Sequence, residues 1–148
     1  MQGISGSGKS TVARQMAAQF EAQGGRAVVL STDDYLMIGN EYVWNHERVC
    51  GAHSRCFRAF IESLQAGIGL VIVDNTNTRV EFASPYMFAA LAFGYSARIV
   101  RVECDPIIAA SRNVHGVPCQ DIRRMAQELD EFRPISGWSM SRVRSRID

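Results

Sequence analysis

The sequence predicts an α/β domain in which a parallel sheet carries helices on both faces. Two short apolar runs bounded by turn residues, 27–30 and 70–73, have the length and β-branched content of buried parallel strands. Segments with helical periodicity separate and follow these runs, and this alternation is typical of parallel α/β folds. A third run, 97–102, carries Arg98 and Arg101 among its apolar residues, so we expect it nearer the edge of the sheet.

Helical periodicity or helix-start signals mark five segments, at residues 10–23, 46–66, 79–93, 106–112 and 118–132. The segment 46–66 is the most regular, with one continuous apolar stripe that ends at Gly67. Pro85 removes a backbone donor and is expected to kink its helix or to delay the start of that helix. The tail beyond Pro134 has no clear period, so we expect it to be partly mobile.

The composition fits one domain of 148 residues, with 47% apolar residues, 21% charged residues and a formal net charge of +1. No apolar run is long enough to span a bilayer, and nothing at the N-terminus marks export. The four cysteines make neither a Cys-x-x-Cys pair nor a disulfide framework, and buried thiols explain them better than metal ligands do. We therefore expect a single cytoplasmic domain over residues 1–148, without a membrane partner.

Residues 3–10 read Gly-Ile-Ser-Gly-Ser-Gly-Lys-Ser and match the Walker A pattern of phosphate-binding loops. The glycines let consecutive backbone N–H groups turn toward an anion, and the helix that starts near Lys9 adds the positive end of its dipole. Lys9, the only lysine in the chain, is expected to bridge the β- and γ-phosphates of ATP, and the hydroxyl of Ser10 to bind Mg²⁺. The alternative is a Gly/Ser turn that binds no ligand. The predicted nucleotide contacts are Ser5, Gly6, Ser7, Gly8, Lys9, Ser10 and Thr11.

The start of the sequence does not fit this motif. A phosphate-binding loop normally follows a strand, but only Met1 and Gln2 precede Gly3. Two residues are too few for a central strand of a sheet. We therefore expect residues upstream of Met1 that complete the strand.

Acidic side chains follow both predicted strands. Asp33 and Asp34 come after the first strand and Asp74 comes directly after the second, at the edge where ligands bind in open parallel sheets. Asp33 is the candidate base that accepts the proton of an attacking hydroxyl, with a helix cap or a solvated turn as the alternative. Asp74 is the candidate for ordering Ser10 or Mg²⁺ and its waters, with a plain helix N-cap as the alternative.

Further motifs follow the Walker A loop in an order typical of one enzyme family. They include Ser31-Thr32-Asp33-Asp34-Tyr35, then Gly39, Tyr42, Trp44 and Asn45, then Ala52-His53, Asp74-Asn75-Thr76-Asn77, Arg112-Asn113-Val114-His115-Gly116-Val117-Pro118, and Arg124-Met125. Over about residues 3 to 130 this set resembles the P-loop polynucleotide 5′-hydroxyl kinase family. The resemblance implies a P-loop kinase fold with a helical lid at about residues 112–131. It also implies ATP and Mg²⁺ as cofactors and the 5′-hydroxyl end of DNA or RNA as the acceptor.

The resemblance implies roles for single residues as well. Asp33 would activate the acceptor hydroxyl, and Arg112 would lie in the lid over the donor phosphates, where a planar guanidinium can hold two phosphoryl oxygens. The arginine with which better-studied members hold the acceptor phosphate has no counterpart here, because Leu36 and Met37 occupy that stretch. Arg79 is the candidate substitute.

Aromatic and basic side chains near these motifs have open roles. Asp34 and Tyr35 are candidates for binding the acceptor. Tyr35, Tyr42 and Trp44 could each stack on an acceptor base, with core or rim packing as the equal alternative for each. His53 is better explained as a structural histidine than as a catalytic one. Arg124 has two open interpretations, a phosphate contact and packing.

Three functions are compatible with the sequence. The first is a magnesium-dependent ATP kinase that phosphorylates a polynucleotide 5′-hydroxyl. The second is a small-molecule kinase that acts on a sugar, a nucleoside or an antibiotic, which the missing acceptor arginine favours. The third is a nucleotide-sensing domain that hydrolyses ATP slowly to control a partner.

Overall fold

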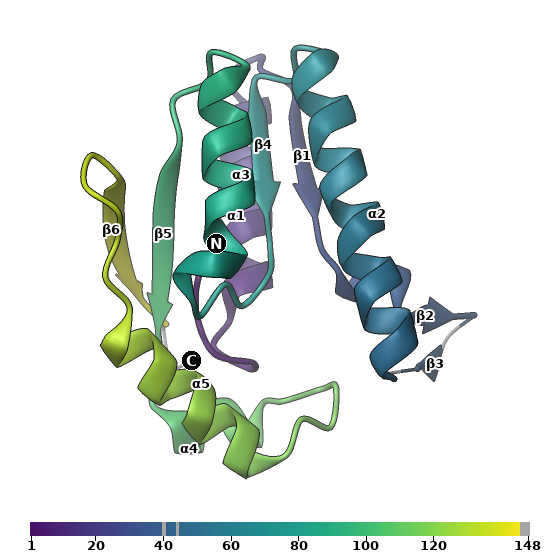
Figure 1. The fold of residues 1–148 in the computed structure, drawn as a ribbon, viewed down its shortest axis with the longest axis vertical. Helices are drawn as coiled ribbons and strands as arrows, with labels where there is room; N and C mark the ends of the chain where they lie inside the picture. Colours follow the sequence, from purple (N-terminus) through teal and green to yellow (C-terminus); the bar gives the residue numbers. More distant parts are fainter. Residues whose placement is uncertain (40, 44, 146–148) are drawn as a thin grey trace. The chain divides into compact units, whose positions relative to one another are not determined.

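The apolar runs form parallel strand pairs in the computed structural model, which describes residues 1–39, 41–43 and 45–145 (Figure 1). Strand β1 (Ala27–Leu30) pairs in parallel with β4 (Leu70–Val73) along its whole length. Strand β5 (Arg98–Glu103) pairs in parallel with β6 (Ser139–Arg144). Helices separate most of these strands in the chain, so the α/β fold with parallel strands is confirmed.

The chain divides into two compact units. We call residues 13–75 the inserted unit and residues 1–12 with 76–148 the terminal unit, after their places in the sequence. Helix α1 (Lys9–Glu21) begins in the terminal unit and continues into the inserted unit. Each unit is described on its own below.

The inserted unit is built around α2 (His46–Gln65), the helix with the clearest periodicity in the sequence. The Asn45 side chain caps it by accepting from Arg48 N over 2.8 Å. Its buried stripe packs on β1 and β4 and comprises Ala52, Cys56, Phe60 and Leu64. Between β1 and α2 lie a short 3-10 helix, η1 (Asp33–Tyr35), and a hairpin of β2 (Met37–Ile38) and β3 (Glu41–Tyr42).

The terminal unit contains α3 (Val80–Ala92), β5, α4 (Pro106–Ser111), α5 (Cys119–Glu131) and β6. Gln2 joins β5 by a parallel bridge at Arg101, in which Gln2 N donates to Val100 O (2.9 Å) and Val102 N donates to Gln2 O (2.8 Å). Strand β5 therefore has β6 on one side and Gln2 on the other. It is therefore not an edge strand itself, but it lies next to β6, which pairs with β5 alone in the described ranges, so the expected place near the edge of the sheet holds.

Arg101 is accommodated in this strand because two of its three guanidinium nitrogens donate hydrogen bonds inside the protein, whereas Nη2 has no partner in the described part of the chain. The side chain is buried, and Nε donates to Gln2 Oε1 over 2.7 Å while Nη1 donates to Leu129 O over 3.0 Å. Burial lowers the pKa of this guanidinium, with the nearby charge of Arg142 acting in the same direction. A charged residue in a strand is thus no evidence for an edge when carbonyl and amide oxygens accept its hydrogen bonds.

The structure corrects two expectations about elements in part. The tail beyond Pro134 forms β6, whose residues are mostly exposed and polar, so no apolar period announces the strand. Of the tail, Arg146 and Asp148 lie outside the described residues. Helix α3 begins at Val80 and contains Pro85, so the proline does not delay its start.

A small core in the terminal unit positions the glycine-rich loop. Ile4 of that loop packs with Ala109 of α4 and with Ile122 and Leu129 of α5. A second cluster joins Met87 of α3 to β5 and to the residue that ends α5. The loop is therefore held by two helices as well as by the bridge at Gln2.

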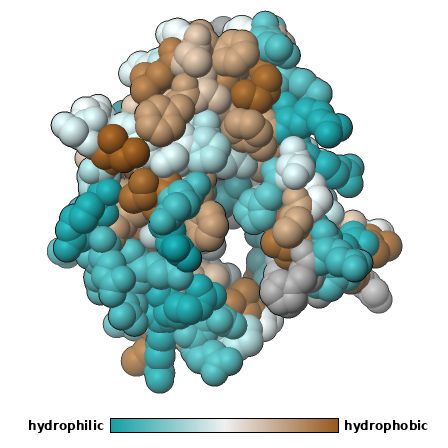
Figure 2. All heavy atoms as spheres, in the orientation of Figure 1, coloured by the Kyte–Doolittle hydropathy of each residue, from teal (hydrophilic) through white to brown (hydrophobic). Residues whose placement is uncertain are grey.

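Helix α3 also exposes apolar side chains. Figure 2 shows apolar residues gathered over the end of α3, and the exposed large ones on and just after this helix are Phe82, Phe88, Leu91 and Phe93. Within residues 1–39, 41–43 and 45–145, no helix combines the length and the apolar character that a bilayer crossing requires.

Candidate functional site

The glycine-rich loop has the backbone that the Walker A pattern predicts. Gly6 and Gly8 have φ angles of 78° and 87°, which side chains disfavour. A Cβ on Gly6 would also lie 2.0 Å from the carbonyl oxygen of Ala109 in α4. Gly6 is therefore required twice, by its backbone angle and by the close approach of α4.

Polar groups of the loop turn inward. Ser7 is fully buried, and its hydroxyl has no hydrogen-bond partner in the described part of the chain. Lys9 is also buried, and its Nζ donates to Ile4 O over 2.8 Å. The next two residues, Ser10 and Thr11, expose their side chains at the start of α1. A buried hydroxyl without a partner suits a loop that binds an oxyanion.

The Arg112-Asn113-Val114-His115-Gly116-Val117-Pro118 motif is a loop organised by Asn113. Its Oδ1 accepts from His115 N over 3.2 Å, and its Nδ2 donates to Val117 O over 2.7 Å. The hydroxyl of Ser5 lies 3.5 Å from Asn113 Oδ1. Asn113 therefore links the segment in front of α5 to the glycine-rich loop.

Arg112 is the residue that ends α4. Its Nη1 donates to the hydroxyl of Ser145 over 3.2 Å. That hydroxyl lies 3.4 Å from the point where a Cβ on Gly8 would stand. The guanidinium thus reaches the surroundings of the loop through Ser145, a residue for which the sequence carried no signal.

In the inserted unit, Asp33 begins η1 after β1. The phenol of Tyr42 donates to Asp33 Oδ1 over 2.9 Å, and Asp33 N donates to the hydroxyl of Ser31 over 3.2 Å. Burial raises the pKa of Tyr42, and the charge and hydrogen bond of Asp33 add to that rise. Tyr42 therefore orients a carboxylate, which is more specific than the stacking or packing role expected for it. Asp34, the next residue, is exposed.

Thr32 ties the residues before Asp33 to neighbouring elements. Its backbone N donates to Asn75 Oδ1 over 2.9 Å, and its hydroxyl lies 3.3 Å from His53 Nδ1 in α2. Desolvation lowers the pKa of His53, and the charge of Asp33 opposes this shift. These contacts agree with the structural role expected for His53.

The ring of Tyr35 makes a cation–π contact that the sequence did not suggest. The guanidinium carbon of Arg55, from α2, lies 4.7 Å from the centroid of the Tyr35 ring. Leu36, which stands in the stretch of the missing acceptor arginine, is buried at 2% exposure. Trp44 lies outside the described residues.

Asp74 follows β4 and is buried. Its backbone N donates to Leu30 O over 2.8 Å, and its carbonyl accepts from the Ser31 hydroxyl over 3.1 Å. Oδ1 is buried and has no hydrogen-bond partner among the described residues. Arg79 is the N-cap residue of α3, so Asp74 does not cap that helix. A buried carboxylate oxygen of this kind fits a cation or its water shell.

Two arginines named from the sequence have protein partners in the terminal unit. Arg79 lies 3.6 Å from Glu81 and stacks over Phe82 at 5.7 Å. Arg124 pairs with Asp121 and Glu128 of α5, which raise its pKa. Arg124 therefore serves α5 itself, and binding of an acceptor by Arg79 stays a prediction.

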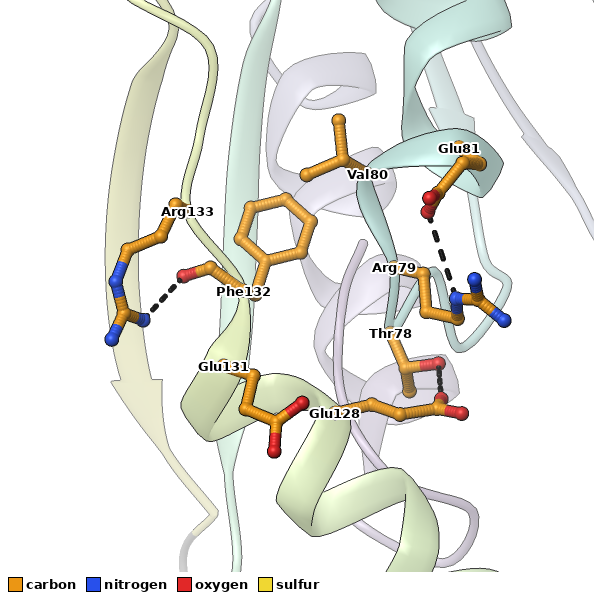
Figure 3. A pocket seen from close by; sticks show the side chains of 8 residues that line it. All are labelled: Thr78, Arg79, Val80, Glu81, Glu128, Glu131, Phe132 and Arg133. Atoms are coloured by element: carbon orange, nitrogen blue, oxygen red, sulfur yellow. Dashed lines mark hydrogen bonds and ion pairs between the residues drawn. The ribbon is translucent and has the colours of Figure 1, made fainter.

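Arg79 also lines a cavity of about 470 Å³ between the start of α3 and the end of α5 (Figure 3). The Thr78 hydroxyl donates to Glu128 there. Three glutamates and two arginines share the lining, so the charge of the cavity does not favour a phosphate. The lining residues are Thr78, Arg79, Val80, Glu81, Glu128, Glu131, Phe132 and Arg133. No group of three or more His, Cys, Asp or Glu side chains able to hold a metal occurs in the described ranges.

Comparison with known proteins places the chain in a family. The sequence model of one AAA domain family matches residues 1–116. The chain belongs to this family. NEDD4-binding protein 2 of Homo sapiens is 30% identical to it over 154 residues, and YLP motif-containing protein 1 of Homo sapiens is 27% identical over 150 residues. The matches cover 100% and 88% of this chain but 8% and 7% of those proteins, so the chain spans less than a tenth of these relatives.

Solved structures resemble its fold. A gluconokinase from Sinorhizobium meliloti 1021 aligns with a TM-score of 0.60 and 18% identity, covering 99% of this chain and 81% of the enzyme. The APS kinase CysC of Mycobacterium tuberculosis, solved with AMPPNP and APS, aligns with a TM-score of 0.62 and 18% identity, covering 99% of this chain and 87% of the enzyme. The chain therefore has a P-loop kinase-like fold.

Proposed function

We propose that this protein is a magnesium-dependent ATP phosphotransferase that phosphorylates the 5′-hydroxyl end of a polynucleotide. The observation that supports this most is the carboxylate of Asp33, which follows β1 and is oriented by the Tyr42 phenol at 2.9 Å. Phosphoryl transfer to an alcohol needs a base that accepts the hydroxyl proton, and a carboxylate with a fixed orientation meets that need.

The donor side of the proposal uses the glycine-rich loop. Its backbone N–H groups and Lys9 bind the phosphates, and Arg112 neutralises the charge that develops on the transferred group. Ser10 and Asp74 would hold Mg²⁺, for which the buried and unpartnered Oδ1 of Asp74 is suited. When bound, the ion supplies further neutralisation of phosphate charge.

The acceptor side uses the residues around η1. Tyr35, two residues after Asp33, offers an aromatic surface, and Arg55 of α2 places its guanidinium over the same ring. A base and a phosphate of a nucleic-acid end need these two kinds of group. Arg55 is thus a second candidate, beside Arg79, for the role of the arginine that is missing where Leu36 stands.

A screen of acceptors tests the function. The protein is incubated with γ-labelled ATP and 5′-hydroxyl DNA or RNA oligomers, and in parallel with gluconate, nucleosides and other small alcohols. We expect label on the oligomers. Asp33→Ala should reduce transfer at least about 100-fold with ATP affinity nearly unchanged, whereas Glu62→Ala, on the exposed face of α2, should match the wild type. Equal loss of transfer and ATP affinity in Asp33→Ala would remove Asp33 from the role of base.

The second candidate is a small-molecule kinase. It is supported by the buried Leu36 in place of the acceptor arginine and by the structural likeness to a gluconokinase and an APS kinase. Label on a small alcohol but not on oligomers would favour it. Tight ATP binding without any labelled acceptor would instead favour a nucleotide-sensing domain.

A further inference from the structure

We propose that Ser145 is a positioning residue that holds the guanidinium of Arg112 beside the glycine-rich loop for phosphoryl transfer. The inference rests on the proposed function, because it takes Arg112 as the cation that meets the transferred phosphate. It gives a role to the end of β6, the part of the chain that the sequence left without structure or function.

Ser145 is fixed by its own backbone. It follows β6 directly, and its N donates to Glu103 O over 2.8 Å, which continues the β5–β6 ladder beyond the last strand residue. The side chain is half-buried. Its hydroxyl therefore stands at a defined point of the sheet rather than on a loose tail.

That point lies at the guanidinium of Arg112 and near the glycine-rich loop. The hydroxyl accepts from Arg112 Nη1 over 3.2 Å and lies 3.4 Å from the place of a Cβ on Gly8. Arg112 stands at the end of a six-residue helix, and its long side chain has many rotamers. A fixed acceptor selects one rotamer before the nucleotide binds, so less freedom is lost in the transition state.

The chemistry of a hydroxyl suits this position. By accepting from Arg112 it holds the cation without neutralising it, and it can still donate its own proton. A carboxylate at the same point would bind Arg112 more tightly but would place a negative charge beside a loop that binds phosphate. The serine thus orients the guanidinium and leaves its charge for the nucleotide.

The test compares five variants with the wild type. Ser145→Ala and the nearly isosteric Ser145→Cys weaken or remove the acceptor, Ser145→Thr keeps it, and Arg112→Ala removes the donor alone or together with Ser145→Ala. Ser141→Ala is the matched control, because Ser141 is exposed on β6, the strand that Ser145 follows, and no side-chain hydrogen bond of it occurs among the described residues. Thermal unfolding confirms that each variant is folded.

The kinetic readout separates a positioning role from a structural one. We expect Ser145→Ala and Ser145→Cys to lower kcat about tenfold while KM for ATP stays within about twofold, as for a hydrogen bond to a charged group that acts in the transition state. Ser145→Thr should retain most of the rate. In the Arg112→Ala background, Ser145→Ala should cause no further loss, because both changes remove one interaction.

A binding readout makes the inference independent of the acceptor. Ser145→Ala should weaken the affinity for ADP with aluminium fluoride, a mimic of the transferred phosphate, about tenfold and leave the affinity for AMPPNP unchanged. Equal weakening of both ligands, or additive losses in the double variant, would overturn the inference. A wild-type protein that labels no acceptor contradicts the proposed function, while this binding readout still decides the role of Ser145.

Discussion

Single polar side chains set the local geometry on both sides of the proposed reaction. Tyr42 orients Asp33 by one hydrogen bond, and Asn113 folds the loop in front of α5 by accepting and donating with its one amide. Asn75 accepts from Thr32 N, and Asn77 adopts a φ of 43° and donates to Met1 O. The side chains of Asn75 and Asn77, between β4 and α3, therefore hydrogen-bond backbone groups of other segments. Asp74 differs, because its Oδ1 has no hydrogen-bond partner among the described residues.

His53 provides a pH-dependent test of the environment of Asp33. Desolvation lowers the pKa of the ring below its usual 6.5, while the charge of Asp33 raises it. We expect an NMR titration of the imidazole, assigned with His53→Gln, to give a pKa below 6.5 in the wild type and a lower one in Asp33→Asn. A higher pKa in Asp33→Asn would contradict the proximity of the two groups.

The lowered pKa of His53 also makes the free energy of unfolding depend on pH. Between the lowered folded pKa and 6.5, the unfolded chain binds more protons at this histidine than the folded chain does. The contribution of His53 to the free energy of unfolding is therefore present above pH 6.5 and is lost as the pH falls through the folded pKa. The difference between wild type and His53→Gln in urea unfolding should follow this trend.

Arg55 provides a test of acceptor recognition. If it binds a phosphate of the acceptor, Arg55→Ala should raise KM for a 5′-hydroxyl oligomer about tenfold, as for one charge-assisted hydrogen bond, and leave KM for ATP unchanged. Arg58→Ala is the control, because Arg58 is exposed on the same helix α2. Steady-state kinetics with both substrates measure the effect. Equal KM values in the two variants would mean that Arg55 only packs on Tyr35.

At the scale of the elements, a position can require glycine for two reasons, a positive φ angle and a lack of space for a Cβ. The contact between the glycine-rich loop and α4 allows these two reasons to be tested separately. Gly6 and Gly94 have φ angles of 78° and 79°, but only Gly6 has a neighbour within 4 Å of an added Cβ, at 2.0 Å. Gly94→Ala should reduce the free energy of unfolding by about 1–2 kcal/mol, the cost of the backbone angle. Gly6→Ala should cost clearly more and abolish nucleotide binding, as measured by urea unfolding and calorimetry. An equal loss of unfolding free energy in the two variants would show that α4 moves to make room for the alanine side chain.

Elements with their own apolar pattern could be predicted from the sequence. The strands at 27–30 and 70–73 have the predicted bounds, and α2 differs from its prediction by one residue at its end. The strands β6 and β2 were not predicted because their residues are largely exposed and carry no buried stripe. The burial of Arg101 in β5 could not be predicted, because a sequence cannot reveal that Gln2 Oε1 and Leu129 O accept its hydrogen bonds.

The residues of the candidate site also fall into those that the sequence indicated and those that it did not. The glycine-rich loop and the acids after the strands were found because motif and spacing encode them. The roles proposed for Tyr42, Arg55 and Ser145 rest on contacts between elements, and Ser145 lies 33 positions from Arg112 in the chain. No local pattern encodes such pairs, so only coordinates could reveal them.

At the scale of the whole molecule, the proposed reaction draws on both units. The glycine-rich loop and Arg112 belong to the terminal unit, while Asp33, Tyr42 and Arg55 belong to the inserted unit. Helix α1, which starts at Lys9, continues from one unit into the other. A kinase requires that donor and acceptor groups act on one phosphate, so the facing of Asp33 and the loop is the prediction on which the function depends.

Hydrogen exchange tests this prediction directly. With AMPPNP alone, we expect slower exchange of backbone amides in residues 3–12, because their N–H groups bind the phosphates. With AMPPNP and a 5′-hydroxyl oligomer together, protection should extend to residues 33–42 of the inserted unit and exceed the protection given by the oligomer alone. Asp33→Ala should keep the first effect. Protection by the oligomer that does not depend on the nucleotide, or none at residues 33–42, would mean that the two units do not serve one reaction.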